Sequence, residues 1–175
     1  MIYLVEREIG FDAAEIGFPS VLGCRAIVTV TAGGLFGYHL NGNLSVAKRN
    51  SYVNFVNGHA QGGGKRMLYA ASTGAGLAAD YAELRAIAAD FHYAGDIYWA
   101  NLNTPGSAYV HYTGVNHATC GITARVWSDP ADNIPANKGA YAAGANRAIA
   151  NGVANAQMFT NVSTAGLRAV YPARI

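Results

Sequence analysis

The feature that most constrains the fold is a run rich in β-branched residues, Arg25-Ala-Ile-Val-Thr-Val-Thr31. Such side chains favour a strand because their restricted χ1 rotamers suit a pleated surface. Ala32-Gly33-Gly34 follows as a turn signal, and Leu35-Phe-Gly-Tyr-His-Leu40 has the composition of a second strand. If Ala32 and Gly33 form a two-residue loop, Thr31 pairs with Gly34 and Ala26 with His39. The sequence therefore predicts a β-hairpin over residues 25–40.

The rest of the chain predicts two helices and several more strands. One helix is expected to begin after Asn43 or Ser45, either of which can cap it, and to run to about Asn57 with Gly58 at its end. An amphipathic pattern predicts a second helix over Leu77–Ala89. Further strands are expected at Ile2–Arg7, Arg66–Ala71, Asp96–Ala100, Ala108–Tyr112, Ile122–Trp127 and Leu167–Tyr171.

These elements indicate a single α+β domain over residues 1–175. No long Pro/Gly/Ser-rich linker divides the chain, because Gln61-Gly62-Gly63-Gly64 is typical of a loop inside a domain. The predicted core is a mixed or antiparallel β-sheet flanked by helices, and a β-sandwich is one form that such a core can take.

Composition narrows the classes of function. The 175 residues carry 12 Lys and Arg against 10 Asp and Glu, and 51% of them are hydrophobic. Lys48-Arg49 and Lys65-Arg66 are isolated basic pairs and form no stripe, so nucleic acid is not expected as a partner. No apolar run reaches about 18 residues, so no membrane span is expected.

Compartment and cysteine state follow from the N-terminal residues. Charge interrupts Met1-Ile-Tyr-Leu-Val-Glu-Arg-Glu8 after five residues, which does not fit a cleaved secretory signal. The expected location is the cytoplasm, or the exterior by a route without a cleaved leader. In that setting Cys24 and Cys120 are expected to stay reduced, although they could form one disulfide.

Cys24 and His39 are the candidate catalytic pair. The predicted register makes them diagonal neighbours on one face of the hairpin, where side chains can meet across a backbone separation of about 7–8 Å. A histidine beside a cysteine can activate the thiol as a nucleophile. Gly23 permits a tight turn in which the backbone N–H groups of Gly23 and Cys24 could hold an oxyanion. From the residues alone, a buried structural cysteine and a structural histidine are the commoner interpretation of such a pair.

The order of these residues resembles a known family. Val21-Leu22-Gly23-Cys24, a hydrophobic strand, Gly33-Gly34, Tyr38 and His39 together resemble the Cys–His hairpin of bacterial glutamine deamidases. That group includes the cytotoxic necrotizing factor catalytic domains, Burkholderia lethal factor 1 and the chemoreceptor deamidase CheD. The similarity covers only about residues 21–41. Leu22 stands where the toxin motif has serine, and Phe18 stands where lethal factor 1 and CheD have the threonine that orients the histidine.

The resemblance implies a function. Cys24 would attack a glutamine carboxamide on a protein substrate, His39 would move the proton, and water would hydrolyse the thioester to glutamate; a primary amine in place of water would give transglutamination. Ser20 could orient His39, but a backbone carbonyl, as in the necrotizing factor domains, is the expected orienting acceptor. No metal or other cofactor is implied. The family also suggests a bacterial toxin or effector that is delivered into a target cell.

Other candidate sites are weaker. The spacing of His111, His117 and Cys120 is looser than in zinc sites, so Cys120 is interpreted as a core residue and no metal is expected. Gln61–Arg66 lacks the hydroxyl residue of a phosphate-binding loop, and Thr73–Gly76 offers only a helix cap. The alternative function is a non-enzymatic β-rich module that binds protein or carbohydrate through a face formed by some of the 11 tyrosines.

Overall fold

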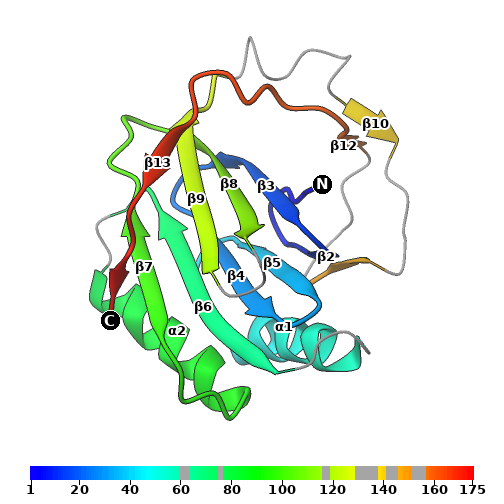
Figure 1. Cartoon of the computed structure of the whole chain (residues 1–175), viewed down its shortest axis with the longest axis vertical. Coiled ribbons are helices and arrows are strands. Elements are labelled where there is room, and N and C mark those ends of the chain that lie inside the picture. Colours follow the sequence, from blue (N-terminus) through cyan, green and yellow to red (C-terminus); the bar gives the residue numbers. More distant parts are fainter. Residues whose placement is uncertain (60–63, 75–76, 116–118, 129–137, 141–145, 151–156) are drawn as a thin grey trace.

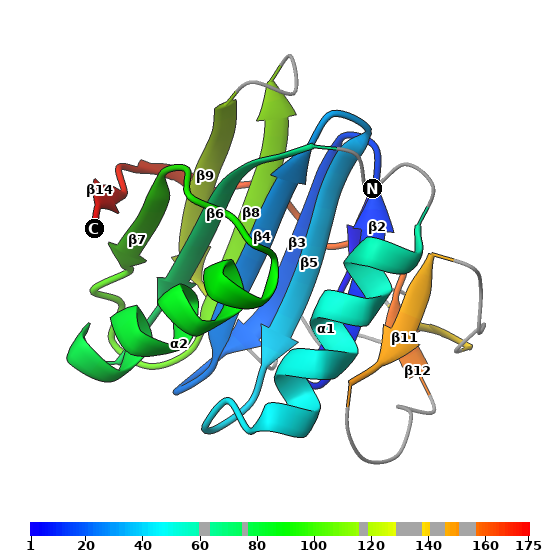
Figure 2. The ribbon, with the colours of Figure 1, turned by 90° about the horizontal axis from the view of Figure 1, so that it is seen from below.

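A computed structural model describes the chain except for residues 60–63, 75–76, 116–118, 129–137, 141–145 and 151–156 (Figure 1). The described residues form the expected α+β fold, with two stacked β-sheets and helices on the outer face of one of them (Figure 2). Most strand pairs are antiparallel, but β1 pairs with β3 and β6 with β7 in parallel, so the sheets are mixed.

The larger sheet has seven strands, in the spatial order β11 (Arg147–Ile149), β2 (Glu8–Asp12), β5 (Gly34–Leu40), β4 (Arg25–Thr31), β6 (Lys65–Ser72), β7 (Ile97–Asn101) and β14 (Ala173–Arg174). The smaller sheet has the order β1 (Ile2–Tyr3), β3 (Glu15–Val21), β8 (Ala108–Val115), β9 (Thr119–Val126) and β13 (Arg168–Val170). A separate pair joins β10 (Lys138–Ala140) to β12 (Gln157–Phe159).

The predicted hairpin is confirmed in its register. Strands β4 and β5 pair Thr31 with Gly34 and Ala26 with His39, as a two-residue loop requires. Both strands are buried almost throughout, because β4 and β5 lie in the middle of the larger sheet between β2 and β6. The hairpin is therefore the centre of the core rather than an edge.

Two helices cover the outer face of the larger sheet (Figure 2). Helix α1 (Val46–Gly58) begins after Ser45, whose hydroxyl accepts the N–H of Lys48 at 3.3 Å, so Ser45 and not Asn43 is the cap. Helix α2 (Leu77–Asp90) matches the predicted second helix. A hydrophobic cluster fills the space under the helices; its largest fully buried members include Tyr38, Tyr52, Phe36, Ile9, Ile27 and Leu40. No helix in the described part of the chain is long and apolar enough to cross a membrane.

A second hydrophobic cluster lies between the sheets, and it contains Leu4, Ile16, Phe18, Cys24, Val28, Val110, Tyr112 and Ile122. Close packing in this cluster depends on glycine. A Cβ built on Gly37 of β5 would lie 2.7 Å from Leu4 Cδ1 and 2.9 Å from Phe18 Cζ, well inside contact distance. The sheets can therefore approach as closely as they do only because this position has no side chain.

The N-terminal prediction was wrong in detail. Only Ile2–Tyr3 of the expected strand Ile2–Arg7 is a strand, and the chain then turns at Arg7, whose φ is 74°. Strands β2 and β3 were not predicted, because each contains a glycine, Gly10 or Gly17, that lowers strand propensity. Both glycines lie where a Cβ would come within 2.7 Å of another side chain, so close packing explains their presence.

Candidate catalytic site

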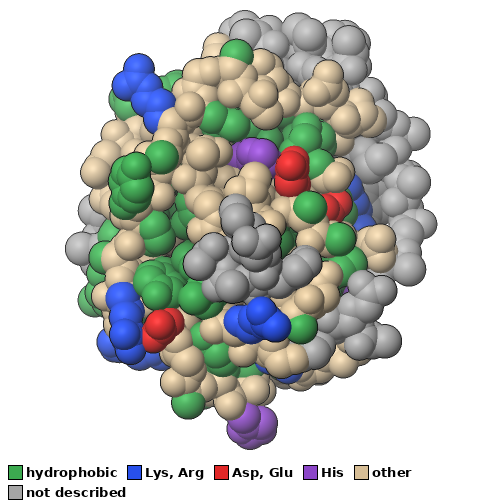
Figure 3. All heavy atoms as spheres, in the orientation of Figure 1, with side chains coloured by type: hydrophobic (Ala, Val, Ile, Leu, Met, Phe, Trp, Pro, Cys, Tyr) green, Lys and Arg blue, Asp and Glu red, His purple; other side chains and the backbone are tan. Residues whose placement is uncertain are grey.

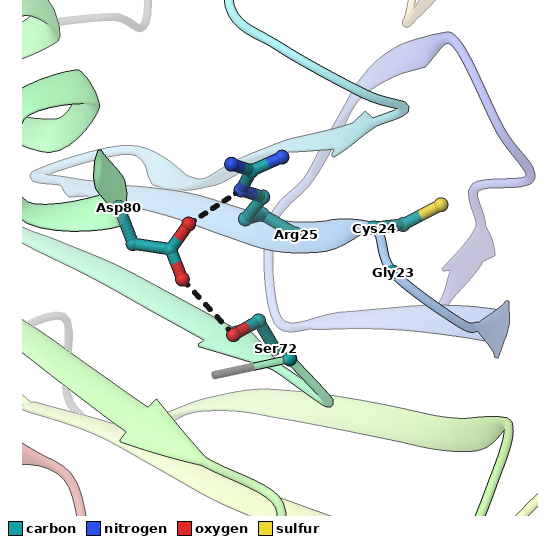
Figure 4. Close-up of a pocket in the computed structure, with 6 residues that line it drawn as sticks. Gly23, Cys24, Arg25, Ser72 and Asp80 are labelled. Atoms are coloured by element: carbon teal, nitrogen blue, oxygen red, sulfur yellow. Dashed lines mark hydrogen bonds and ion pairs between the residues drawn. The ribbon is translucent and has the colours of Figure 1, made fainter. Parts of the chain in front are cut away.

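Cys24 lies immediately before the first residue of β4. The preceding Gly23 has a φ of +63°, a left-handed conformation that suits glycine and turns the chain into the strand. The Cys24 side chain belongs to the cluster between the sheets and is only 3% exposed. Figure 4 shows its sulfur pointing away from Arg25 and Asp80, which lie on the helix side of the sheet. The thiol therefore faces the inter-sheet core.

His39 is completely buried on β5, and a backbone carbonyl holds its ring. Nδ1 donates a hydrogen bond to the carbonyl oxygen of Leu4 at 2.9 Å, and the N–H of Arg7 donates to the carbonyl of His39 at 2.9 Å. Because a carbonyl only accepts, the proton of the neutral ring lies on Nδ1 and the lone pair on Nε2. The expectation that a backbone carbonyl bonds the imidazole is confirmed.

The free ring nitrogen is the most unusual feature of the site. In the part of the chain that the structure describes, Nε2 of His39 has no hydrogen-bond partner although it is buried. An unpaired polar group in the interior costs about 1–3 kcal/mol and calls for an explanation. A role as a general base, which accepts a proton during a reaction, is one such explanation.

The two candidate catalytic residues share a face. Ala26 pairs with His39, and Cys24 lies two residues before Ala26, so Cys24 and His39 are diagonal neighbours between the sheets. The thiol, however, donates its hydrogen bond to Oε1 of Glu6, at 3.6 Å. Oε2 of the same carboxylate accepts from Nδ2 of Asn41 at 2.6 Å. The thiol proton is thus held by Glu6 and not by His39.

Glu6 is the site residue that the sequence did not reveal. It lies in the turn between β1 and β2, within a segment that was predicted as a continuous strand. Its contact with Cys24 spans 18 residues and its contact with Asn41 spans 35. No local periodicity connects positions so far apart, so only the folded chain brings them together.

In the structure without substrate, the surroundings of Cys24 and His39 favour the neutral form of each side chain. Burial raises the pKa of the Cys24 thiol to about 11, the charge of Glu6 adds to the rise, and the backbone of Leu22 and the charge of Arg25 oppose it. Burial likewise lowers the pKa of His39, against the hydrogen bond to Leu4 and the charge of Glu6. At neutral pH the pair is therefore a thiol and a neutral imidazole, and not a standing ion pair.

Two other predicted site residues already have partners. The Gly23 N–H, a candidate oxyanion donor, donates to Oγ1 of Thr73 at 3.1 Å. Ser20 lies at a bulge in β3 with a φ of 58°, and its hydroxyl accepts from Ser107 at 3.3 Å. The Leu4 carbonyl holds the ring position that Ser20 would have taken. Phe18 lies edge-on to the imidazole at 5.9 Å between centroids, so it packs against the ring.

A pocket of about 170 Å³ opens beside the Cys24 backbone, lined by Gly23, Cys24, Arg25, Ser72, Gly74 and Asp80 (Figure 4). The Asp80 carboxylate, 4% exposed, accepts from Arg25 Nε at 2.7 Å, Ser72 Oγ at 3.1 Å and Trp99 Nε1 at 3.3 Å. These hydrogen bonds hold the side chains on this side of the pocket in fixed positions. The pocket has the volume of a few water molecules. A small polar group such as a carboxamide fits these dimensions, but the Cys24 sulfur points away from Arg25 and Asp80 on this side of the pocket.

The looser His–Cys cluster does not converge in the described residues. His117 lies outside them, and they contain no group of three His, Cys, Asp or Glu side chains placed to hold a metal ion. His111 stacks on Tyr109 and lies 3.4 Å from Glu15. Cys120 packs against the inter-sheet core, and burial raises its pKa to about 12. The loop residues 61–63, and Ala75 and Gly76, also lie outside the described residues.

The aromatic residues of the alternative function are mostly inside the protein. Trp99, Trp127 and six tyrosines are buried: Tyr3, Tyr38, Tyr52, Tyr69, Tyr109 and Tyr112. Figure 3 shows the charged side chains scattered over the face it views, without a large patch of one sign. Residues that fill the core cannot also form a binding surface, so few tyrosines remain for that role.

The chain is thus an α+β protein with a buried cysteine and a buried, carbonyl-anchored histidine on one face of a central hairpin. Comparison with protein-family models finds no match, and comparison with curated proteins finds none either. We therefore infer the function from the geometry of this site.

Proposed function

We propose that the chain is a Cys–His glutamine deamidase that converts a glutamine side chain of a protein substrate to glutamate and releases ammonia. The observation that carries the proposal is the buried Nε2 of His39, which has no hydrogen-bond partner among the described residues and lies on the face that also bears Cys24. The Leu4 carbonyl keeps the other ring nitrogen protonated, so the free nitrogen is the basic one.

The first half of the reaction forms a thioester. The Cys24 sulfur attacks the carboxamide carbon while its proton passes to Nε2 of His39, and the carbonyl oxygen becomes an oxyanion. N–H groups at Gly23 and Cys24 are the donors for that oxyanion once the Thr73 hydroxyl leaves Gly23. The carbon–nitrogen bond then breaks, and the imidazolium protonates the leaving group as ammonia.

The second half regenerates the enzyme. His39 takes a proton from water, which attacks the thioester, and the carbon–sulfur bond breaks to give glutamate and the thiol. A primary amine in place of water gives transglutamination as a side activity. Because the resting pair is neutral, we propose that proton transfer accompanies attack and does not precede it.

Only the family resemblance suggests a biological setting for this proposed activity. A bacterial toxin or effector that acts on a protein inside a target cell is the setting that such a deamidase would have. Partner choice would then depend on the shape of the surface around the pocket, because the net charge of +2 offers little long-range steering.

The test is a search for glutamine-to-glutamate conversion in proteins. The protein is incubated with unfractionated bacterial and animal cell lysates, and converted sites are counted by peptide mass spectrometry. Cys24→Ser and His39→Ala are expected to abolish conversion, while Cys120→Ser is expected to retain it, because Cys120 only packs against the inter-sheet core and has no part in the proposed reaction. Conversion that is equal in the wild type and Cys24→Ser, or absent from every lysate, refutes the proposal.

A further inference from the structure

Glu6 connects the surface to the buried thiol. Its side chain is exposed, yet its two carboxylate oxygens contact Cys24 Sγ at 3.6 Å and Asn41 Nδ2 at 2.6 Å. Cys24 itself is 3% exposed. An exposed carboxylate on a buried nucleophile is a contact that the proposed chemistry does not need.

We propose that Glu6 is a latch that holds the Cys24 thiol in an inactive, protonated arrangement until substrate displaces the carboxylate. That this arrangement is inactive rests on the proposed function, in which Cys24 is the nucleophile. The contact and its effect on thiol chemistry do not depend on which reaction the protein catalyses.

The backbone holds Glu6 in place from both sides. The N–H of Leu4 donates to Gly17 at 2.8 Å, and the N–H of Arg7 donates to the carbonyl of His39 at 2.9 Å. Glu8, which is fully buried, accepts the N–H of Val5 at 2.9 Å and Arg147 Nη1 at 3.0 Å. The turn that carries Glu6 is thus tied to both sheets, and the same short segment supplies the Leu4 carbonyl that orients His39.

A single proton explains how the latch works. The thiol has one hydrogen, so it cannot donate to Glu6 and to His39 at the same time. While Glu6 accepts it, Nε2 of His39 stays without a partner, as the structure shows for the described residues. Removing the carboxylate frees the proton for His39, and it also removes a negative charge that disfavours the thiolate.

The ionisable groups around the thiol act in known directions. Glu6 from the β1–β2 turn raises the pKa of Cys24, and Arg25 from β4 lowers it. His39 from β5 is neutral at rest, because burial lowers its pKa. Tyr112 from β8 donates its hydroxyl to the carbonyl of Ala26 and stays protonated, because burial raises its pKa far above the usual value. Glu6 is therefore the anion whose removal changes the thiol most.

The test is the pH dependence of Cys24 alkylation by iodoacetamide, followed at the Cys24 peptide by mass spectrometry. In the wild type the reaction should reach half its maximal rate near the raised pKa of about 11. In Glu6→Gln the midpoint should move to lower pH, and the rate at neutral pH should rise about tenfold for each unit of the shift. Glu15→Gln, the same change on a partly exposed glutamate beside His111, should leave the midpoint unchanged.

The midpoint must be read together with the state of the core. Burial is the largest cause of the raised pKa of Cys24, so a core that opens also lowers the midpoint, whereas loss of the latch lowers it while the core stays closed. A midpoint that does not move overturns the latch. Cys120 reports on the core in the same sample: it is partly buried against the inter-sheet cluster, so its own alkylation rate should stay at the wild-type value unless the core opens. If Glu6→Gln opens the core, Glu6→Asp serves as the second variant. It keeps the negative charge but shortens the side chain, so the carboxylate lies farther from Cys24 and the midpoint of alkylation should still move to lower pH.

The latch and the deamidase can fail separately. A shifted midpoint in Glu6→Gln with no glutamine conversion in lysates supports the latch and refutes the proposed reaction. Glutamine conversion that needs Cys24, with an unmoved midpoint in Glu6→Gln, supports the reaction and refutes the latch.

Discussion

Gly37→Ala is the substitution that most directly tests how the sheets position His39. Gly37 lies on β5, two residues before His39 and so on the same face. A Cβ at this position would lie 2.7 Å from Leu4 Cδ1, 2.9 Å from Phe18 Cζ and 3.0 Å from Ile16 Cδ1. Leu4 and Phe18 are also the residues that bond and pack the imidazole.

The expected cost follows from those distances. Ordinary contact begins at 3.4 Å, so each of the three side chains must retreat by 0.4 to 0.7 Å at once. Overpacking of this kind in a filled core costs about 1–3 kcal/mol. If the Leu4 backbone shifts with its side chain, the bond from Nδ1 of His39 to the Leu4 carbonyl should weaken, and the proposed deamidation should fall by more than the folded fraction does.

Urea unfolding measures the stability effect, and Gly114→Ala is the matched control. The nearest atom to a Cβ at Gly114 is Leu35 Cδ2 at 3.4 Å, an ordinary contact, so this change should be neutral or stabilising by about 0.4–1 kcal/mol. If Gly37→Ala unfolds at the same urea concentration as Gly114→Ala or later, the argument about sheet packing is wrong.

Three further outcomes are expected. Tyr52→Phe removes a buried hydroxyl that bonds Thr29 and the Phe36 carbonyl, and should lower the free energy of unfolding by about 1–3 kcal/mol. Tyr171→Phe, at an 89% exposed position, should change nothing in the same urea titration. Arg25→Leu leaves the buried Asp80 without its cation and should cost about 3–5 kcal/mol by thermal or urea unfolding, unless Asp80→Asn is combined with it. Burial lowers the pKa of His39 in the folded protein below 6.5, so at lower pH the unfolded state binds the extra proton and the free energy of unfolding should fall as pH drops below 6.5. The urea midpoint should depend less on pH in His39→Gln than in the wild type. An equal dependence in the two proteins contradicts this assignment.

Local pattern was sufficient for the elements whose signals lie within one segment. The β-branched run and the glycine turn defined β4, β5 and their register, and Asn43 or Ser45 was the expected cap of α1, of which Ser45 is the one observed. The register in turn placed Cys24 and His39 on one face. These predictions succeeded because turn geometry and side-chain alternation act between near neighbours in the chain.

Longer-range features were not predictable in the same way. Strands β2 and β3 escaped prediction because close packing, and not strand propensity, selects their glycines. A Cβ at Gly10 would meet Leu4 and Ile2 across the sheets, whereas one at Gly17 would meet Tyr3 and Tyr109 from the neighbouring strands of its own sheet. Packing also decided which tyrosines are core residues, since alternation alone cannot say which face of a strand another layer will cover.

The sequence by itself thus determined a hairpin that carries a cysteine and a histidine on one face, because local geometry sets strand register. The tertiary structure decided the chemical state of that pair. The Leu4 carbonyl reaches His39 from 35 residues away, and the Glu6 carboxylate reaches Cys24 from 18 residues away. Burial between the sheets then shifts both pKa values toward the neutral forms. Protonation depends on the groups and the solvent around a side chain, and only the folded chain assembles them.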